Sequence, residues 1–197
     1  MTVWGQPTTW TEIFGFVSGA WCVYLVTRKS IWNWPVGIAN NLFFALLFWR
    51  VTLYADMALQ GVYLVLAVWG WLFWLNGGPA GSPAPIRRMG RRDWVLTATG
   101  VVLGTVLMHA ILVRINGSAP WADAFTTALS LAAQVALSRK MLENWWLWMA
   151  ADLVYVPLYA ARGLPLTAVL YAGFFILCVI GLRAWSRDFE ARRGVLA

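Results

Sequence analysis

The sequence predicts an all-α integral membrane protein with seven transmembrane helices. Of its 197 residues, 61% are hydrophobic and only 12% are charged, whereas about a quarter of an ordinary soluble domain is charged. Seven mostly apolar segments are each long enough to cross a bilayer, which takes about 20 residues. The first three segments resemble the last three in sequence, so we expect a 3+1+3 arrangement.

The expected spans follow one another with short connections. They cover approximately residues 11–27, 31–50, 55–76, 93–114, 120–138, 143–161 and 165–184. The one long connection is 77–92, where glycine, proline and arginine predict a flexible basic linker. We therefore divide the chain into a first three-helix bundle (1–76), a basic cytoplasmic linker with an inverting helix (77–115), and a second three-helix bundle with a cytoplasmic tail (116–197).

The distribution of lysine and arginine predicts the orientation in the membrane. Twelve of the 15 basic residues would lie on one side: Arg28, Lys29, Arg87, Arg88, Arg91, Arg92, Arg139, Lys140, Arg183, Arg187, Arg192 and Arg193. Only Arg50, Arg114 and Arg162 would lie on the other. Because cytoplasmic loops are enriched in basic residues, we expect the N-terminus outside and the C-terminus in the cytoplasm. The net charge of +7 then reflects topology and not a nucleic-acid partner.

A shift of 111 residues aligns the two halves of the chain without a gap. The matched positions are Arg28-Lys29 with Arg139-Lys140, Asn33 with Asn144, Trp34 with Trp145, Leu47 with Leu158, Leu53 with Leu164, Gly70 with Gly181, and Trp74 with Trp185. Four spans separate the halves, so both would have the same orientation, and the fourth span would be the inverting helix. This parallel repeat is the layout of SWEET-type carriers, in which the substrate lies near the bilayer midplane between the bundles.

Polar side chains within the spans are costly and are therefore candidates for substrate contacts. They include Asn40, Asn41, Gln60, Thr127, Gln134 and Asp152. Asp152 lies nine residues into its span, about 13 Å deep, and the 111-residue shift matches it with Asn41. We expect these two groups to face each other across the axis of the repeat.

Trp145, Trp148 and Asp152 have the i, i+3, i+7 spacing of one helix face. Two tryptophans beside a carboxylate suit a flat cationic ring, because Trp faces attract cations and the carboxylate supplies the counter-charge. Alternatively, the tryptophans belong to an interfacial aromatic belt. The sequence has no G-x-x-x-x-G-K-[ST] loop and no His/Cys/Glu metal cluster, so we expect no cofactor, no metal site and no enzyme activity.

The motifs taken together resemble the PnuC family of bacterial vitamin transporters, over about residues 13–185. They are Trp32-x-Trp-Pro-x-Gly37, Leu53-Tyr-Ala-Asp-x-x-Leu-Gln60, Gly70-Trp71, Trp121-x-Asp-Ala-x-Thr-Thr-Ala-Leu-Ser130, Glu143-Asn-Trp-x-x-Trp148 with Asp152, and Gly163-Leu-x-x-Thr-x-x-Leu-Tyr171. The resemblance implies that the pair Trp145 and Trp148 contributes to a substrate site. We add Asn144 and Tyr171, which stand in the same motifs, as candidates.

The resemblance also implies a biological role. Members of the family take up nicotinamide riboside, thiamine or riboflavin across the bacterial inner membrane by facilitated diffusion. A separate cytoplasmic kinase traps the vitamin by phosphorylation, and the transporter is a homotrimer with a SWEET-like fold.

The residues of the candidate site also indicate which of these vitamins is the substrate. Nicotinamide riboside carries a pyridinium and thiamine a thiazolium, and both suit two tryptophans beside Asp152, whereas riboflavin is neutral and larger. We therefore expect nicotinamide riboside, with thiamine and then riboflavin as alternatives. A non-transporting membrane scaffold is an alternative of a different class, but it would need no acid at mid-depth.

Overall fold

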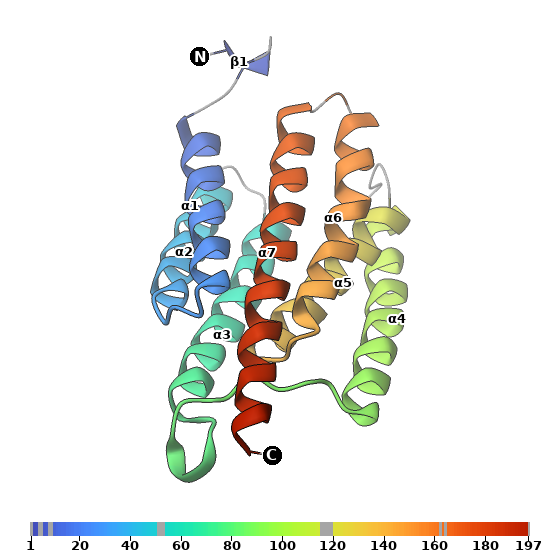
Figure 1. Cartoon of the computed structure of the whole chain (residues 1–197). Coiled ribbons are helices and arrows are strands. Elements are labelled where there is room, and N and C mark those ends of the chain that lie inside the picture. Colours follow the sequence, from blue (N-terminus) through green and yellow to red (C-terminus); the bar gives the residue numbers. More distant parts are fainter. Residues whose placement is uncertain are drawn as a thin grey trace. The chain divides into compact units, whose positions relative to one another are not determined.

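The computed structural model describes residues 2–3, 6–7, 10–50, 54–114, 120–161, 163 and 165–196. Within these residues the chain forms seven α-helices (Figure 1): α1 (Trp10–Thr27), α2 (Asn33–Arg50), α3 (Tyr54–Asn76), α4 (Arg91–Arg114), α5 (Pro120–Ser138), α6 (Asn144–Ala161) and α7 (Pro165–Leu196). A two-residue strand β1 (Thr2–Val3) pairs antiparallel with β2 (Gln6–Pro7), and η1 (Pro79–Gly81) is a short 3-10 turn. The seven predicted helices are confirmed. The main difference is that α7 continues twelve residues beyond the expected end at 184.

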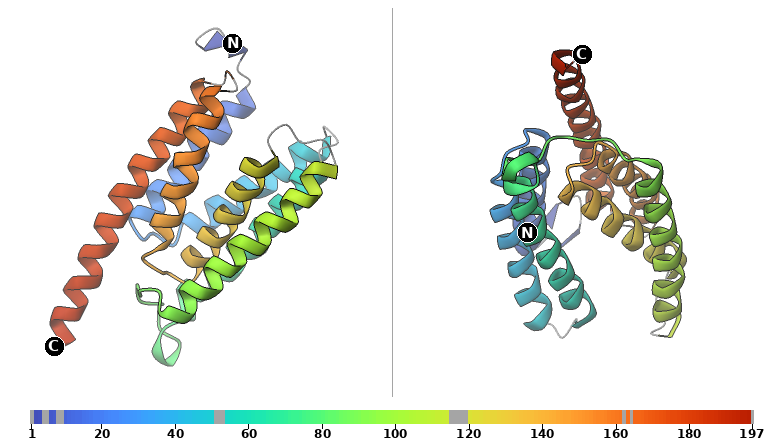
Figure 2. Two further views of the ribbon diagram at one scale, coloured as in Figure 1. Left: turned by 90° about the vertical axis from the view of Figure 1, so that its right-hand side faces the viewer. Right: turned by 90° about the horizontal axis from the view of Figure 1, so that it is seen from below.

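The helices belong to two compact units, 1–85 and 86–197, which are described separately. In the first unit, α2 packs against both α1 and α3. In the second, α5 packs against α4 and α6, and α6 packs against α7; Figure 2 shows α4 and α5 side by side. The fourth helix, expected to be part of a separate linker, thus packs with the helices that follow it.

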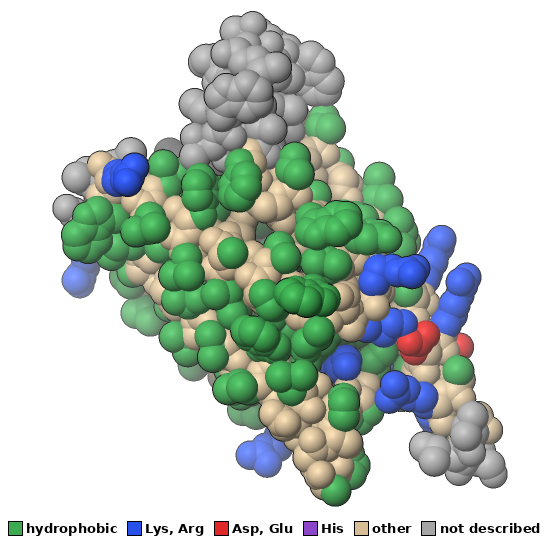
Figure 3. Space-filling model, turned by 90° about the vertical axis from the view of Figure 1, so that its left-hand side faces the viewer, with side chains coloured by type: hydrophobic (Ala, Val, Ile, Leu, Met, Phe, Trp, Pro, Cys, Tyr) green, Lys and Arg blue, Asp and Glu red, His purple; other side chains and the backbone are tan. Residues whose placement is uncertain are grey.

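The surface of the helices is strongly apolar. Large hydrophobic side chains are exposed on both units, among them Leu46, Val65, Leu103 and Leu153, each more than 60% exposed. Hydrophobic side chains cover most of the face shown in Figure 3. By length and composition, three segments among the described residues are sufficient to cross a membrane: Met57–Asn76, Arg91–Arg114 and Thr167–Gly194. That the other four helices also span remains a prediction.

The helix boundaries repeat with the offset found in the sequence. α2 and α6 begin at Asn33 and Asn144 and end at Arg50 and Ala161, and α1 and α5 end at Thr27 and Ser138. Each member of these pairs is separated from its counterpart by 111 residues. The two halves therefore share helix boundaries as well as sequence.

The turns that precede α2 and α6 have the same hydrogen bonds. The Nδ2 group of Asn33 donates to the Ser30 carbonyl at 2.7 Å, and Asn144 donates to the Met141 carbonyl at 2.6 Å. Just before, Lys29 and Lys140 adopt left-handed backbone conformations with φ values of 56° and 54°. Arg-Lys followed by Asn thus forms the same kind of turn between consecutive helices twice, from α1 to α2 and from α5 to α6.

Each half also contains one edge-to-face tryptophan pair. The Trp34 and Trp74 rings lie 5.4 Å apart at 87°, and the Trp145 and Trp185 rings lie 5.5 Å apart at 87°. All four side chains are 2% exposed or less. This pair joins the second helix of each half to the third, α2 to α3 and α6 to α7.

The segment 77–92, predicted from its composition to be a flexible linker, has defined contacts with both units. Its first part folds back on α3, where the Ala84 amide donates to the Trp74 carbonyl at 3.1 Å. Its second part forms a parallel bridge between Arg87 and Met141. Ala84, Ile86 and Met89 are buried.

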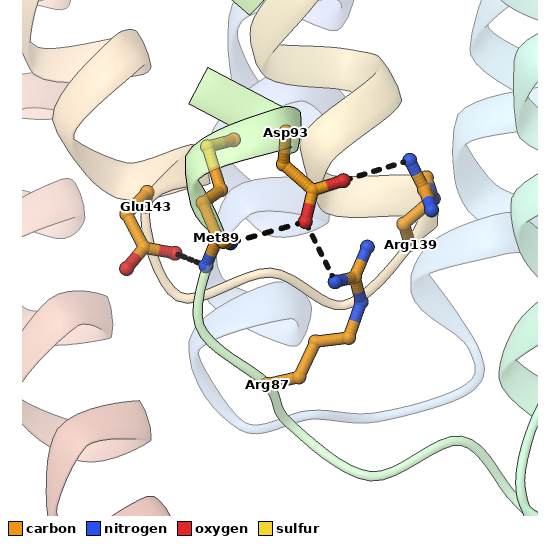
Figure 4. A network of polar contacts seen from close by, with 6 residues as sticks. Arg87, Met89, Asp93, Arg139 and Glu143 are labelled. Carbon is orange, nitrogen blue, oxygen red and sulfur yellow. Dashed lines mark hydrogen bonds and ion pairs between the residues drawn. The ribbon is translucent and has the colours of Figure 1, made fainter. Parts of the chain in front are cut away.

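Two carboxylates fix the second part of this segment (Figure 4). Glu143 accepts a hydrogen bond from the Met89 amide at 2.8 Å. Asp93 accepts from the Gly90 amide and forms ion pairs with Arg87 at 2.9 Å and Arg139 at 3.3 Å. We call these groups the Asp93–Glu143 network; it joins the start of α4 to the turn between α5 and α6.

Candidate functional site

Asp152 lies at mid-length in α6 and is only 4% exposed. It lies next to Cys178 of α7, whose thiol donates to Oδ2 at 3.9 Å. Among the described residues, no lysine or arginine forms an ion pair with this carboxylate. A buried acid without a cationic partner is costly, so Asp152 is the side chain in the second unit best suited to receive a positively charged group.

Three stacked tyrosines lie on the same part of α6 and α7. The Tyr155 and Tyr171 rings are 4.5 Å apart, and the Tyr159 and Tyr171 rings are 5.2 Å apart and almost parallel. Phe174 meets Tyr171 edge-on at 5.8 Å. All three tyrosines are half-buried. We call Tyr155, Tyr159 and Tyr171 the tyrosine stack.

The tyrosine stack continues the face that Asp152 begins. Tyr155 and Tyr159 follow Asp152 at i+3 and i+7, so the three share one side of α6. Tyr171 was expected to belong to the site, whereas Tyr155 and Tyr159 were not. The same spacing argument, extended beyond Asp152 toward the end of the helix, would have found them.

Trp148 lies on α6, one turn before Asp152, and packs toward α5. It is half-buried and packs against a cluster of buried residues from α5 and α6 that includes Ala133, Ala136 and Ala151. Because part of its ring remains accessible, Trp148 is available to stack on a planar group.

Trp145 and Asn144 have their contacts within the fold. Trp145 is 1% exposed, meets Trp185 edge-on, and lies against Gly181. Asn144 is fully buried, and its amide holds the turn before α6. The equivalent positions Trp34 and Asn33 make the same contacts in the first unit, which accounts for this part of the motif by packing. A ligand role for Trp145 and Asn144 remains a prediction.

Trp34 and Trp145, which occupy equivalent positions in the two halves, each have a buried indole N–H group without a hydrogen-bond acceptor among the described residues. Oδ1 of Asn144 is also buried with no hydrogen-bond partner among the described residues. The unpaired indole N–H occurs at equivalent positions in both halves. We therefore assign it to the edge-to-face tryptophan pair that each half contains.

The remaining candidates are half-buried polar groups. Thr127 and Gln134 lie on α5 of the second unit. In the first unit, Asn41 and Gln60 lie on α2 and α3. Asn40 has a defined structural contact, because its Nδ2 group donates to the Ser18 hydroxyl of α1 at 2.6 Å. The structure thus places Trp148 and Asp152 on neighbouring turns of α6 and brings Tyr171 of α7 against Tyr155 and Tyr159, one and two turns beyond Asp152.

Comparison with known proteins identifies the class of molecule. Residues 9–187 match the family described as nicotinamide mononucleotide transporter. The chain is 29% identical to the riboflavin/roseoflavin transporter RibM of Streptomyces davaonensis, over 91% of this chain and 86% of the relative. It is 23% identical to the nicotinamide riboside transporter PnuC of Escherichia coli, over 95% of this chain and 90% of the relative.

The fold is also similar to that of a solved structure. The crystal structure of the vitamin B3 transporter PnuC superposes with a TM-score of 0.73 at 24% identity, covering 94% of this chain and 84% of that one. Because the matched family model spans nearly the whole sequence, the chain belongs to the nicotinamide mononucleotide transporter family, that of the PnuC proteins, whose members are membrane transporters and not enzymes.

Proposed function

We propose that this protein takes up a vitamin with a flat ring, most readily nicotinamide riboside, across the bacterial inner membrane. The observation that carries the proposal is Asp152, a buried carboxylate without a cationic partner among the described residues, next to the tyrosine stack and near Trp148. A pyridinium ring supplies the missing positive charge and stacks on aromatic faces. Relatives named for nicotinamide riboside support this choice.

We propose substrate contacts for most of the candidate residues. Asp152 would pair with the charged ring, and Trp148 and Tyr171 would stack against it. Thr127 and Gln134 would bind the ribose hydroxyls. Asn41 joins the proposal because it occupies the repeat position equivalent to Asp152, and Asn40 and Gln60 join it as polar groups of the first unit.

Riboflavin is the second candidate. It is favoured by the relative RibM, named for riboflavin and 29% identical. Thiamine, with its cationic thiazolium, would use Asp152 as nicotinamide riboside does.

Binding calorimetry distinguishes these candidates. Purified protein is titrated with nicotinamide riboside, thiamine and riboflavin, first as wild type and then as Asp152→Asn. We expect the substitution to weaken a cationic vitamin more than tenfold, about 1.4 kcal/mol, and to change riboflavin affinity little. Asp188→Asn, an acid-to-amide change on the last part of α7, is the matched control. Unchanged affinity for a cationic vitamin in Asp152→Asn would assign Asp152 to the fold, and no heat with any vitamin would contradict the proposal.

We further propose facilitated diffusion with the N-terminus outside and the C-terminus in the cytoplasm, by a homotrimer with the two halves in a 3+1+3, SWEET-like parallel repeat. The equal helix boundaries and turns of the two halves support the repeat. A cytoplasmic kinase would trap the product. In proteoliposomes without ATP or an ion gradient, vitamin should equilibrate to equal concentrations inside and out. Enclosing the kinase together with ATP as its phosphoryl donor should raise total uptake. Accumulation that requires an imposed ion gradient would contradict facilitated diffusion.

A further inference from the structure

A groove of about 380 Å³ runs between α4 and α5, and none of the candidate substrate residues lines it. Its floor is made of small residues, Gly100 and Gly104 from α4 and Ala128, Ala132 and Ala136 from α5. A Cβ atom on Gly104 would meet Ala128 at 3.3 Å, whereas one on Gly100 would have nothing within 4 Å. The helices therefore touch at Gly104 and leave open space at Gly100.

The surroundings of the groove are those of a surface in contact with lipid. On α4, Leu96, Val102, Leu103 and Leu107 are each more than half exposed, and Thr105 is the one buried residue of this helix. Exposed aliphatic side chains on a membrane helix lie against acyl chains. A groove in such a surface is filled by a chain of lipid or by another helix.

The open end of the groove carries excess positive charge. Arg139 lines it and is 38% exposed, and its ion pair with Asp93 uses one of the five N–H donors of a guanidinium group. Arg91 and Arg92, in the first turn of α4, are exposed, and Arg92 lies one turn before the groove residue Leu96. Arg87 also pairs with Asp93, and Glu143 binds the Met89 amide at the same end, so four guanidinium groups are set against two carboxylates. A guanidinium binds a phosphate group through paired hydrogen bonds.

The length of the groove corresponds to one leaflet of the bilayer. From Asp93 to Gly104 is eleven residues, roughly 16 Å along the helix, and half of the hydrocarbon core is about 15 Å. Both the charged end and the apolar length therefore match a phospholipid whose phosphate lies at the membrane surface. A helix of another protein would not need its charge confined to one end.

We propose that the groove between α4 and α5 binds one anionic phospholipid, with the phosphate on Arg92 and Arg139 and an acyl chain along Gly100 and Ala132. The site rests on the membrane location of the family and is independent of which vitamin is carried. Its occupant ties α4 to α5 along the open part of their interface.

Native mass spectrometry tests this proposal with purified protein released from nanodiscs of phosphatidylcholine with or without phosphatidylglycerol. Wild type should retain phosphatidylglycerol in preference to phosphatidylcholine. Gly100→Leu should abolish retention by filling the groove, and the double variant Arg92→Gln/Arg139→Gln should weaken it about tenfold. Ala110→Leu on exposed α4 surface and Arg193→Gln on α7 are the matched controls and should retain the lipid.

Three outcomes would overturn the proposal. The first is equal retention by Gly100→Leu and wild type. The second is displacement of phosphatidylglycerol by inorganic phosphate alone, which would place the specificity in the arginines without the groove. The third is loss of oligomer mass in Gly100→Leu while lipid is retained, which would make the groove an interface between copies of this chain. Vitamin calorimetry on Gly100→Leu reports separately whether the substrate site is intact.

Discussion

Asp152 and Trp145 lie two turns apart on α6, yet their surroundings differ. The indole of Trp145 is enclosed by Trp185 and Gly181, whereas Asp152 contacts a thiol and adjoins aromatic rings. The spacing i, i+3, i+7 predicts that these residues share one face of a helix, and both lie in α6. It could not separate packing from ligand contact, because apolar surroundings in a membrane protein come from neighbouring helices and from lipid alike.

The close approach of Gly181 to Trp145 gives a prediction for stability. A Cβ atom at Gly181 would overlap the Trp145 ring, so Gly181→Ala should destabilise the protein by about 1–3 kcal/mol, the usual cost of overpacking a core. Thermal unfolding in detergent measures the effect. Gly173→Ala on the same helix has open space around the added methyl and should keep or slightly raise the midpoint. Equal midpoints for the two variants would show that α6 and α7 adjust around the ring.

At the scale of elements, the sequence predicted helices well and their connections less well. Apolar length and basic flanks fixed six of the helices to within a few residues, since a bilayer demands a minimum span. The contacts of the segment 77–92 were not predicted, because glycine and proline indicate irregular backbone and say nothing about the partners of that backbone. Its anchors are distant: Glu143 is 54 residues from the Met89 amide that it binds. Such pairing has no local signature.

The anchoring of this segment can be measured by proteolysis. Asp93→Asn weakens the ion pairs with Arg87 and Arg139, and Glu143→Gln weakens the contact with Met89. Since these groups are partly exposed, we expect each change to cost about 1 kcal/mol and to speed tryptic cleavage after Arg87 or Arg88 roughly fivefold. Glu190→Gln on exposed α7 is the control. Rapid cleavage of wild type at these arginines would contradict an anchored segment.

At the scale of the whole molecule, two copies of one helix plan are joined in a single chain. The offset of 111 residues was readable from the sequence because Arg-Lys, Asn and Trp recur at identical spacing, and the structure explains why those residues recur. Each copy uses the lysine for a left-handed turn, the asparagine to close it, and the tryptophan to join two helices. The sequence could not show these contacts, since the partners Trp74 and Trp185 are only two among 15 tryptophans.

The proposed orientation predicts which side of the membrane each connection faces. In a chain with Cys22 and Cys178 replaced by serine, a single cysteine at Ser82 should react with a membrane-impermeant maleimide only after the cells are opened. A single cysteine at Ala161, the exposed last residue of α6, should react in intact cells. The charge bias of the loops is the physical reason. Labelling of Ser82→Cys in intact cells would contradict the proposed orientation and indicate the opposite one.

Lys29 and Lys140, whose backbones are in the left-handed conformation, relate the proposed orientation to backbone strain. At a φ near 55°, glycine is the relaxed residue and lysine carries a cost of about 1 kcal/mol. In both halves the chain accepts this strain and keeps a cation where the turn would face the cytoplasm. A glycine at Lys29 or Lys140 would relax the turn and at the same time remove a charge that directs insertion. A lower backbone conformational energy and the charge that directs insertion therefore favour different residues at the same position, once in each half.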